Sequence, residues 1–173
     1  KYYNEYQEAI AYKTMLDRAS VSHPSGSCNS RKETGKTYDC HCDEDGRNCS
    51  QCKETVPCTN NYSFDSYSFP SINYYTVQIN DTARKNHTAY QIINAGSGTA
   101  SSGMRWANLQ QSDSSCCRPS GDYSYNHSAA LSSAQSRVSA AQTNYNNAAK
   151  KAKQLDVKTT LQNIKVRVLI TLK

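Results

Sequence analysis

Large apolar side chains are scarce in this sequence. Its 173 residues include only two Phe, one Trp and two Met, and the hydrophobic fraction is 36%. Tyrosine is the one abundant aromatic residue, with 13 copies, and each copy carries a hydroxyl that needs water or a hydrogen-bond partner. A chain of this length can form one domain with a core of useful size. With so little apolar mass, we expect that core to depend on cross-links or on neighbouring chains.

Long hydrophobic runs and targeting signals are absent as well. No stretch of 18 apolar residues occurs, so no segment is expected to span a membrane. No signal-peptide pattern is present, and the chain begins at Lys1 rather than at Met. We therefore expect a processed product or a trimmed soluble portion, which is attached to a membrane only through a missing segment upstream of Lys1.

Common catalytic signatures are also missing. The sequence has no G-x-S-x-G, P-loop or H-E-x-x-H pattern. His23 precedes a proline, and His41 lies between two cysteines. His87 and His127 lie inside N-x-S/T sequons, and carboxylates cluster only at residues 43–45. We expect a protein that is not an enzyme, with no catalytic, cofactor-binding or metal-binding residues.

Positive charge is concentrated at one end of the chain. The net charge is +6, and the segment 137–173 holds eight Lys or Arg against one acid, Asp156, so the remainder carries about −1. A nucleic-acid surface would interleave arginine, aromatic residues and glycine. Here the lysines fall on the polar side of regular elements. This pattern favours a solvated face over an anionic partner, and no nucleic acid is expected to bind.

Eight cysteines are the most informative feature that is present. The spacing C-x-C-x6-C-x2-C, with His41 as a spare ligand, would suit zinc but leaves four cysteines without a role. Disulfides use all eight and imply an oxidising compartment. The two adjacent cysteines are expected to reach different partners in the Cys-rich segment, because a ring between neighbours is strained. The expected half-cystines are Cys28, Cys40, Cys42, Cys49, Cys52, Cys58, Cys116 and Cys117.

Five asparagines begin the sequon N-x-S/T, which permits N-glycosylation of a secreted protein. This is barely more than the chain's Asn, Ser and Thr content gives by chance. The sequons therefore allow glycosylation without establishing it. The possible sites are Asn48, Asn61, Asn80, Asn86 and Asn126.

The first 128 residues predict one helix and a few strands. Residues 2–20 have a helical apolar period that ends at a His-Pro pair, and residues 21–60 predict an irregular cross-linked segment. The alternating segments 72–80 and 88–95, joined by the polar link 81–87, predict a hairpin with a long loop. A flexible Gly/Ser loop at 96–103, a possible third strand at 104–111 and a further loop at 112–128 follow it.

The remaining residues predict a helix and then a strand. Eight small or apolar residues recur at alternating spacings of three and four, which is an unbroken heptad seam. Because most are alanine, the seam buries little area and needs a close partner, either the N-terminal helix or another subunit. Residues 161–173 alternate apolar and polar side chains, which predicts a terminal strand. The seam residues are Leu131, Ala134, Val138, Ala141, Tyr145, Ala148, Ala152 and Leu155.

Two stretches give the chain a resemblance to type IV pilin-like proteins. "YYNEYQEAIAYKTMLDRAS" resembles the soluble end of the first pilin helix, and "YYTVQINDTARKNHTAYQII" is similar to the strand, loop and strand of that family. The adjacent cysteines 116 and 117 are similar in place to its C-terminal cysteine-closed loop. The six-cysteine segment and the Ala-rich helix depart from the family. The resemblance implies a helix on an antiparallel sheet, displayed on a filament outside the inner membrane.

The sequence therefore predicts an α+β fold, in which an N-terminal helix and a C-terminal heptad helix pack on an antiparallel, disulfide-stapled sheet. We expect one extracytoplasmic domain over residues 1–173, located outside the cell or at its surface. Its expected function is that of a structural or adhesive subunit of a filament-like assembly, with itself or another protein of the assembly as partner. The alternative is a secreted, monomeric, Cys-rich module that binds a glycan, small ligand or receptor. The four expected segments are a helix at 1–20, an irregular Cys-rich segment at 21–60, a β-rich segment at 61–128, and the Ala-rich helix with its terminal strand at 129–173.

Overall fold

The computed structural model describes residues 1–79 and 92–171, and for residues 78–79, 92–95 and 164–171 it describes the backbone alone. The fold is α+β with antiparallel sheets and four disulfides, as predicted. The chain divides into two compact units. Unit 1 comprises Lys1–Ala19, Phe69–Gly103 and His127–Lys173, and unit 2 comprises Ser20–Ser68 and Met104–Asn126. The expectation of a single domain stays a prediction.

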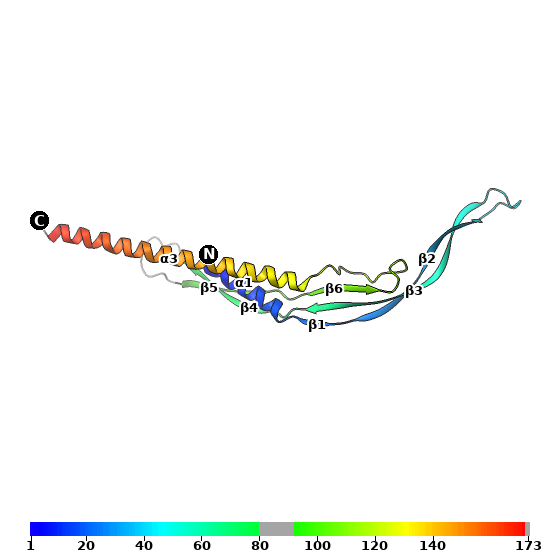
Figure 1. The fold of residues 1–173 in the computed structure, drawn as a ribbon. Helices are drawn as coiled ribbons and strands as arrows, with labels where there is room; N and C mark the ends of the chain where they lie inside the picture. The colour runs from blue at the N-terminus through cyan, green and yellow to red at the C-terminus, as the bar shows by residue number, and fades with distance from the viewer. Residues whose placement is uncertain (80–91, 172–173) are drawn as a thin grey trace. The chain divides into compact units, whose positions relative to one another are not determined.

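Unit 1 contains both helices and a β-hairpin. Helix α1 (Tyr2–Asp17) contacts the long helix α3 (His127–Thr171) and also the hairpin formed by β4 (Ile72–Ile79) and β5 (Ile92–Ala100), as Figure 1 shows. The two helices run antiparallel, because Glu8 meets Arg137 at 3.2 Å near one end. At the other end, the ring of Tyr145 packs against those of Tyr3 and Tyr6.

The core of unit 1 combines several alanines with a few larger side chains, Met15, Leu16 and Phe69. The buried apolar residues of α1 are Ala9, Ala11, Met15 and Leu16, and those of α3 are Ala134 and Ala141. Alanines on facing helices let the two backbones approach closely, although each buries little area. A side-chain amide adds a specific polar contact to the hairpin: Asn4 Nδ2 donates to the Val77 carbonyl at 3.0 Å, and its Oδ1 accepts from the Val77 N–H at 2.8 Å. Asn4 thus satisfies both backbone groups of one strand residue.

Unit 2 is a sheet with β3 (Ser50–Ser68) at its centre. Ser66–Ser68 pair with both β1 (Ser20–Ser22) and β6 (Met104–Gln111), and residues 62–63 pair with both β2 (Ser25–Cys40) and β6. Because a strand has two edges, β1 and β2 share one edge of β3 and β6 occupies the other. Within the described residues, Ala107 is the one apolar side chain of this unit that is buried.

Beyond β6, the strands β2 and β3 continue as a two-stranded ribbon over residues 31–57, and no third strand pairs with it in the described chain. Such a ribbon is marginally stable in water on its own. Polar cross-strand pairs hold it: Lys53 meets Glu33 at 2.9 Å, and Arg31 donates to the side chain and carbonyl of Thr55 at 2.9 and 2.8 Å. Charged side chains and Pro57 also make its open edges poor templates for further strands.

Several predicted elements are confirmed and three are wrong. The strands at residues 72–80 and 104–111 form as β4 and β6, and the first helix ends three residues earlier than predicted. Residues 21–60 are not irregular, because most of them belong to β2 and β3. Part of the supposed flexible loop 96–103 belongs to β5. The link 81–87 lies outside the described residues, as do the first four residues of the predicted strand 88–95.

The predicted terminal strand is also wrong, because α3 continues through residue 171. No glycine or proline occurs after residue 127 to end the helix, and a helix that is already nucleated extends at little further cost. A strand, in contrast, needs a neighbour to satisfy its backbone groups. The alternation of apolar residues at 164–172 was therefore a misleading signal.

The seam between the helices can be tested at Ala141, whose side chain is 9% exposed, by comparison with the exposed Ser139. Ala141→Glu should destabilise the protein by about 2 kcal/mol or more, because it forces a charge into the α1–α3 contact. Ser139→Glu adds the same charge to open surface and should change stability by less than about 0.5 kcal/mol. Thermal melting of the two variants measures this, and equal melting temperatures would show that the seam is not an interface.

Candidate functional site

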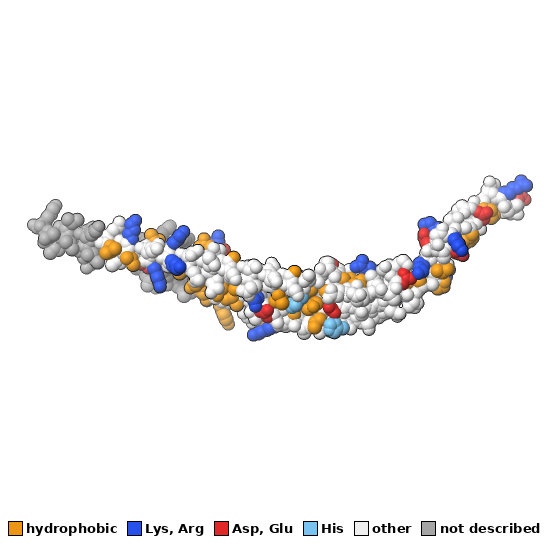
Figure 2. Space-filling view, viewed as in Figure 1, with side chains coloured by type: hydrophobic (Ala, Val, Ile, Leu, Met, Phe, Trp, Pro, Cys, Tyr) orange, Lys and Arg blue, Asp and Glu red, His pale blue; other side chains and the backbone are white. Residues whose placement is uncertain are grey.

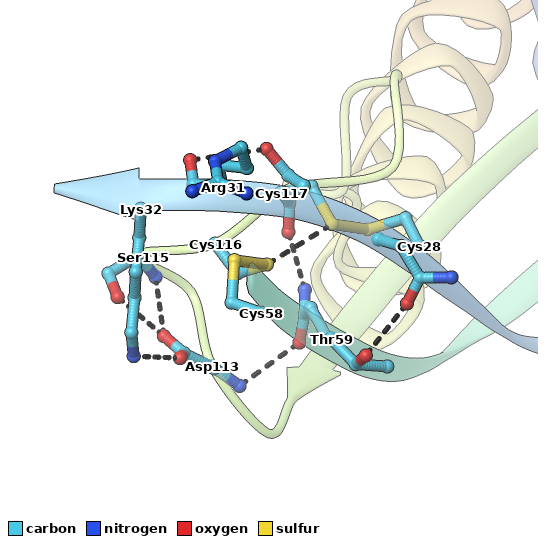
Figure 3. The surroundings of a disulfide bond; sticks show 12 residues. Cys28, Arg31, Lys32, Cys58, Thr59, Asp113, Ser115, Cys116 and Cys117 are labelled. Carbon is cyan, nitrogen blue, oxygen red and sulfur yellow. Dashed lines mark hydrogen bonds and ion pairs between the residues drawn. A yellow bond between two sulfur atoms is a disulfide. The ribbon is translucent and has the colours of Figure 1, made fainter. Parts of the chain in front are cut away.

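Two disulfides clamp a loop onto one face of the sheet in unit 2. Cys28 bonds to Cys117 and Cys58 bonds to Cys116, with Cα–Cα distances of 6.2 and 5.8 Å. Figure 3 shows the two bridges side by side. Cys28 pairs with Asn60 across the β2–β3 ladder and Cys58 pairs with Ser30, so these side chains share one face. The adjacent cysteines thus reach different partners, as the sequence predicted.

Asn60 fills the centre of this clamp. It is 0% exposed, the lowest value for a large side chain among the described residues. Its Nδ2 donates to Gln111 Oε1 at 3.1 Å and to the Cys117 carbonyl at 2.6 Å. Its Oδ1 accepts from the Asp113 N–H at 3.0 Å and from Ser112 Oγ at 3.4 Å. An amide has two donors and two acceptor lone pairs, so the buried side chain is fully satisfied. We call Asn60 and its two flanking disulfides the Asn60 clamp.

An ion pair lies beside the clamp. Lys32 Nζ meets Asp113 Oδ2 at 2.5 Å, and Asp113 Oδ1 accepts hydrogen bonds from the N–H and hydroxyl of Ser115 at 3.0 and 2.5 Å (Figure 3). The hydrogen bond from Lys32, followed by those from Ser115, lowers the pKa of the Asp113 carboxyl to about 2. Asp113 is therefore ionised wherever the pH is above that value, and it ties the loop to β2.

The other two disulfides close the far end of the ribbon. Cys40 bonds to Cys52 and Cys42 to Cys49. Residues 41–49, which we call the tip loop, follow Cys40 and include the Cys42–Cys49 bridge. Asp43 organises this loop. Its carboxylate accepts from the Arg47 N–H at 2.5 Å and from Asn48 Nδ2 at 2.9 Å. Two disulfides and an ordered turn therefore hold in shape a loop that is mostly exposed.

The zinc alternative is ruled out by this pairing. The ligand atoms of Cys40, His41 and Cys52 do lie within 4.8 Å of one another. However, all eight cysteine sulfurs are in disulfides, and no free cysteine is present. A disulfide sulfur is not the thiolate that zinc requires. The expectation that the protein holds no metal otherwise stays a prediction.

The sequons fall in different places. Asn48 contributes its amide to the tip loop, while Asn61 lies exposed on β3. Asn126 is exposed just before α3. Asn80 and Asn86 lie outside the described residues. Whether any of the five is glycosylated stays a prediction.

The heptad seam is covered over only part of its length. Ala134 and Ala141 are buried, and Leu131, Val138, Tyr145 and Ala148 are half-buried. Ala152 and Leu155 are exposed, although they continue the same seam. Six of the eight predicted interface residues are therefore buried or half-buried, and of these Tyr145 packs on the rings of Tyr3 and Tyr6 in α1.

Of the histidines, His23 shows a specific polar contact. Its Nδ1 lies 2.8 Å from Asp65 Oδ1, and Asn108 Nδ2 donates to Asp65 Oδ2 at 2.8 Å. The hydrogen bond from Asn108, more than that from His23, lowers the pKa of Asp65. The imidazole side chain is 70% exposed.

Sequence analysis missed Asn60 and Asn4, because nothing in a local pattern separates a buried asparagine from an exposed one. The only sequence signal near Asn60 is the cysteine two residues before it. Trp106 and Asp122 likewise carry no local sequence signal of a site.

Comparisons with known proteins add no identity: no family model, no curated protein and no solved structure matches this chain. The four disulfides indicate an oxidising compartment, and so an extracellular or secreted protein. Among the described residues, no helix combines the length and the apolar character needed to cross a bilayer.

Thiol titration of the denatured, unreduced protein should give close to zero free thiols, since all eight cysteines are paired.

The disulfides should differ in their contribution to stability. Cys28 and Cys117 are 89 residues apart, and Cys42 and Cys49 only seven. With the other bridges intact, Cys58–Cys116 and Cys40–Cys52 shorten the loop that Cys28–Cys117 closes to about 20 residues. Loop entropy then predicts a loss of about 3 kcal/mol for Cys28→Ser/Cys117→Ser and about 2 kcal/mol for Cys42→Ser/Cys49→Ser. If denaturant unfolding gave the same loss of unfolding free energy for both double variants, the Cys28–Cys117 bridge would not be the more stabilising one.

The ion pair predicts a pH dependence. Asp113 has an ordinary pKa of 3.8 and a folded pKa of about 2. Its contribution to stability is therefore fully present above about pH 4 and is lost as the pH falls toward 2. The melting temperature of Asp113→Asn should be lower than that of the wild type at pH 7, with the difference shrinking toward pH 2. A difference that stays constant over this range would contradict the assignment.

Proposed function

We propose that this protein is a non-enzymatic structural or adhesive subunit of a filament- or pilus-like extracellular assembly. The observation that carries the proposal is the uncovered part of α3. We call residues 149–163 the α3 extension. Every residue in it is exposed, including three large apolar ones: Leu155 at 64%, Val157 at 59% and Leu161 at 56%. Figure 2 shows hydrophobic side chains on the surface of α3 next to its grey end.

A helix of this kind is marginal in water without a packing partner. Isolated helices of 12–15 residues are at the limit of stability even in favourable sequences. Within unit 1, α1 stabilises α3 as far as Tyr145 and Ala148. Beyond that point, nothing in the described chain covers the helix. A neighbouring helix in an assembly would bury the exposed apolar residues and stabilise the extension.

The extension has apolar residues on two opposite faces. At 100° per residue, Leu155 continues the seam that α1 covers, whereas Val157 and Leu161 lie on the far side. A helix that is apolar on more than one face is usually buried between neighbours. Two faces per subunit would allow each subunit to contact two others, which is the requirement for a continuing assembly rather than a closed pair.

The charges of the extension bear on the neighbour's chemistry. The α3 extension contains four lysines and a single acid, Asp156, so its net charge is positive. The lysines are Lys150, Lys151, Lys153 and Lys158. Two such extensions would repel each other if packed side by side. The neighbouring surface should therefore be acidic around an apolar strip, whether it belongs to another copy or to a second component.

A second candidate function is a secreted, monomeric binding module. It is favoured by the tip loop, where two of the four disulfides hold an exposed turn instead of a core. Such a loop is pre-organised, which lowers the entropy lost on binding a partner. The two functions differ in oligomeric state and so can be separated by one measurement.

Light scattering in native buffer should show a mass that grows with protein concentration. Leu155→Glu should weaken this association at least about tenfold, since burying one Leu is worth about 1.5–3 kcal/mol. Asn163→Glu adds the same charge between the two apolar faces, about 80° from Leu155 and 120° from Val157, and serves as the matched control, with little effect expected. A wild-type mass of one chain at every concentration would exclude self-assembly through the α3 extension and would leave the monomeric module, or assembly with a second component only.

A further inference from the structure

An open groove of about 430 Å³ lies in unit 2 between β6 and the segment that follows the Asn60 clamp. A second groove of about 500 Å³ adjoins it and shares Asp122 and Ser124. Both volumes are within the usual range for small-ligand sites. The first groove is lined by Met104, Arg105, Trp106, Asp122, Ser124 and Tyr125.

Trp106 is held in place by its neighbours. Its ring lies 5.9 Å from that of Tyr123 and 6.5 Å from that of Phe64. Gly121, with a φ of +144°, lies so close that an added Cβ would sit 3.0 Å from the indole carbons Cε3 and Cζ3. The indole is nevertheless only half-buried and lines the groove. Part of the indole is therefore open to the groove, while its neighbours hold it in position.

Backbone contacts fix the opposite wall. The Tyr125 N–H donates to the Trp106 carbonyl at 3.2 Å, and Ser124 forms an isolated antiparallel bridge with Ala107. The register of β6 on β3 shifts beside Asn108, which has a positive φ of 55°. A bulge of this kind redirects the side chains around it. The two walls are thus set by hydrogen bonds rather than by loop contacts alone.

Charged groups of both signs stand next to the indole. Asp122 Oδ1 accepts from the Ser124 N–H at 2.9 Å, and this turn leaves the carboxylate at the surface of the groove. The hydrogen bonds from Ser124 lower the pKa of Asp122, with a smaller contribution from the charge of Arg105. Arg105 uses Nη1 on the Met104 carbonyl at 2.9 Å and has further N–H donors to offer.

We propose that this groove binds a pyranose ring of a glycan, stacked on Trp106, with two of its hydroxyls donating to Asp122 and another accepting from Arg105. A pyranose has one face of C–H groups, which suits an aromatic surface, and a rim of hydroxyls that both donate and accept. The adjoining groove, with Asn108, Gln111 and Arg118 in its wall, would take the next sugar of an oligosaccharide.

The same features argue against an apolar peptide side chain as the occupant. Such a side chain would cover Asp122 and Arg105 without offering them hydrogen bonds, and the desolvation of unpaired charged groups is costly. A hydroxyl-rich ring satisfies these groups and still uses the indole. Glycan binding would add an adhesive activity to unit 2, and it does not depend on the assembly through α3.

The groove contains its own reporter, because Trp106 is the only tryptophan of the chain. The methyl glycosides of galactose, glucose, mannose and N-acetylglucosamine should be titrated into the protein while Trp106 emission is recorded. We expect at least one to shift the emission, with a Kd on the order of 1–10 mM, as befits one ring with few contacts. An oligosaccharide of that sugar should bind more tightly.

Two variants remove the polar contacts while leaving the fluorophore. Asp122→Asn and Arg105→Gln should each weaken binding of the responding sugar at least about tenfold. Asp39→Asn, the same change at an exposed carboxylate of β2 that lies outside both the groove and the tip loop, is the matched control and should bind as the wild type does. Near-ultraviolet circular dichroism checks that each variant keeps its fold.

Three results would overturn the proposal. One is that no glycoside of the panel alters Trp106 emission at about 50 mM, well above the expected Kd. A second is that folded Asp122→Asn and Arg105→Gln bind the sugar as tightly as Asp39→Asn does. The third is that a tyrosine- or leucine-containing peptide, and no sugar, produces the emission change. None of these results bears on the mass measurement that tests assembly.

Discussion

Unit 2 depends on the Asn60 clamp, because little else can hold it together. Ala107 is its one buried apolar side chain in the described chain, so burial of apolar area supplies little of its stability. Instead, two disulfides restrict the unfolded chain and leave a loop over one face of β2 and β3. A fully bonded asparagine fills the space beneath. The clamp also fixes the start of the segment that carries Gly121, Asp122 and Tyr125, and so it supports the groove beside Trp106.

Unit 1 meets the same shortage of apolar mass in a different way. Its helices approach through alanines and stack tyrosine rings at the end of the contact. Close approach yields dense packing from small side chains, but the area buried per residue is low. The stability of α3 therefore falls off where α1 ends its contact near Tyr145. This is the physical reason that the proposed assembly centres on residues 149–163.

The sequence predicted those features that follow from local periodicity or from cysteine number. Heptad spacing predicted the interface of α3 as far as Ala148, and the adjacent cysteines predicted two separate bridges. The ribbon was missed because cross-strand pairs such as Lys53–Glu33 stabilise it and leave no apolar alternation to detect. The terminal strand was predicted from alternation alone, which a continuing helix can also contain. Asn60 and the Trp106 groove depend on residues far apart in the chain, so no window of sequence could reveal them.

A chain with little core has a functional consequence, because most of its side chains remain at the surface. Stability that comes from disulfides and polar pairs does not depend on which side chains occupy the rest of the surface. The ribbon, the tip loop and the groove beside Trp106 can then vary in sequence without loss of the fold, as long as the clamp persists. The α3 extension is the exception, since its leucines and valine are costly to leave in water. In the proposed assembly a neighbouring subunit would cover this apolar surface, whereas the polar surfaces of unit 2 would stay exposed.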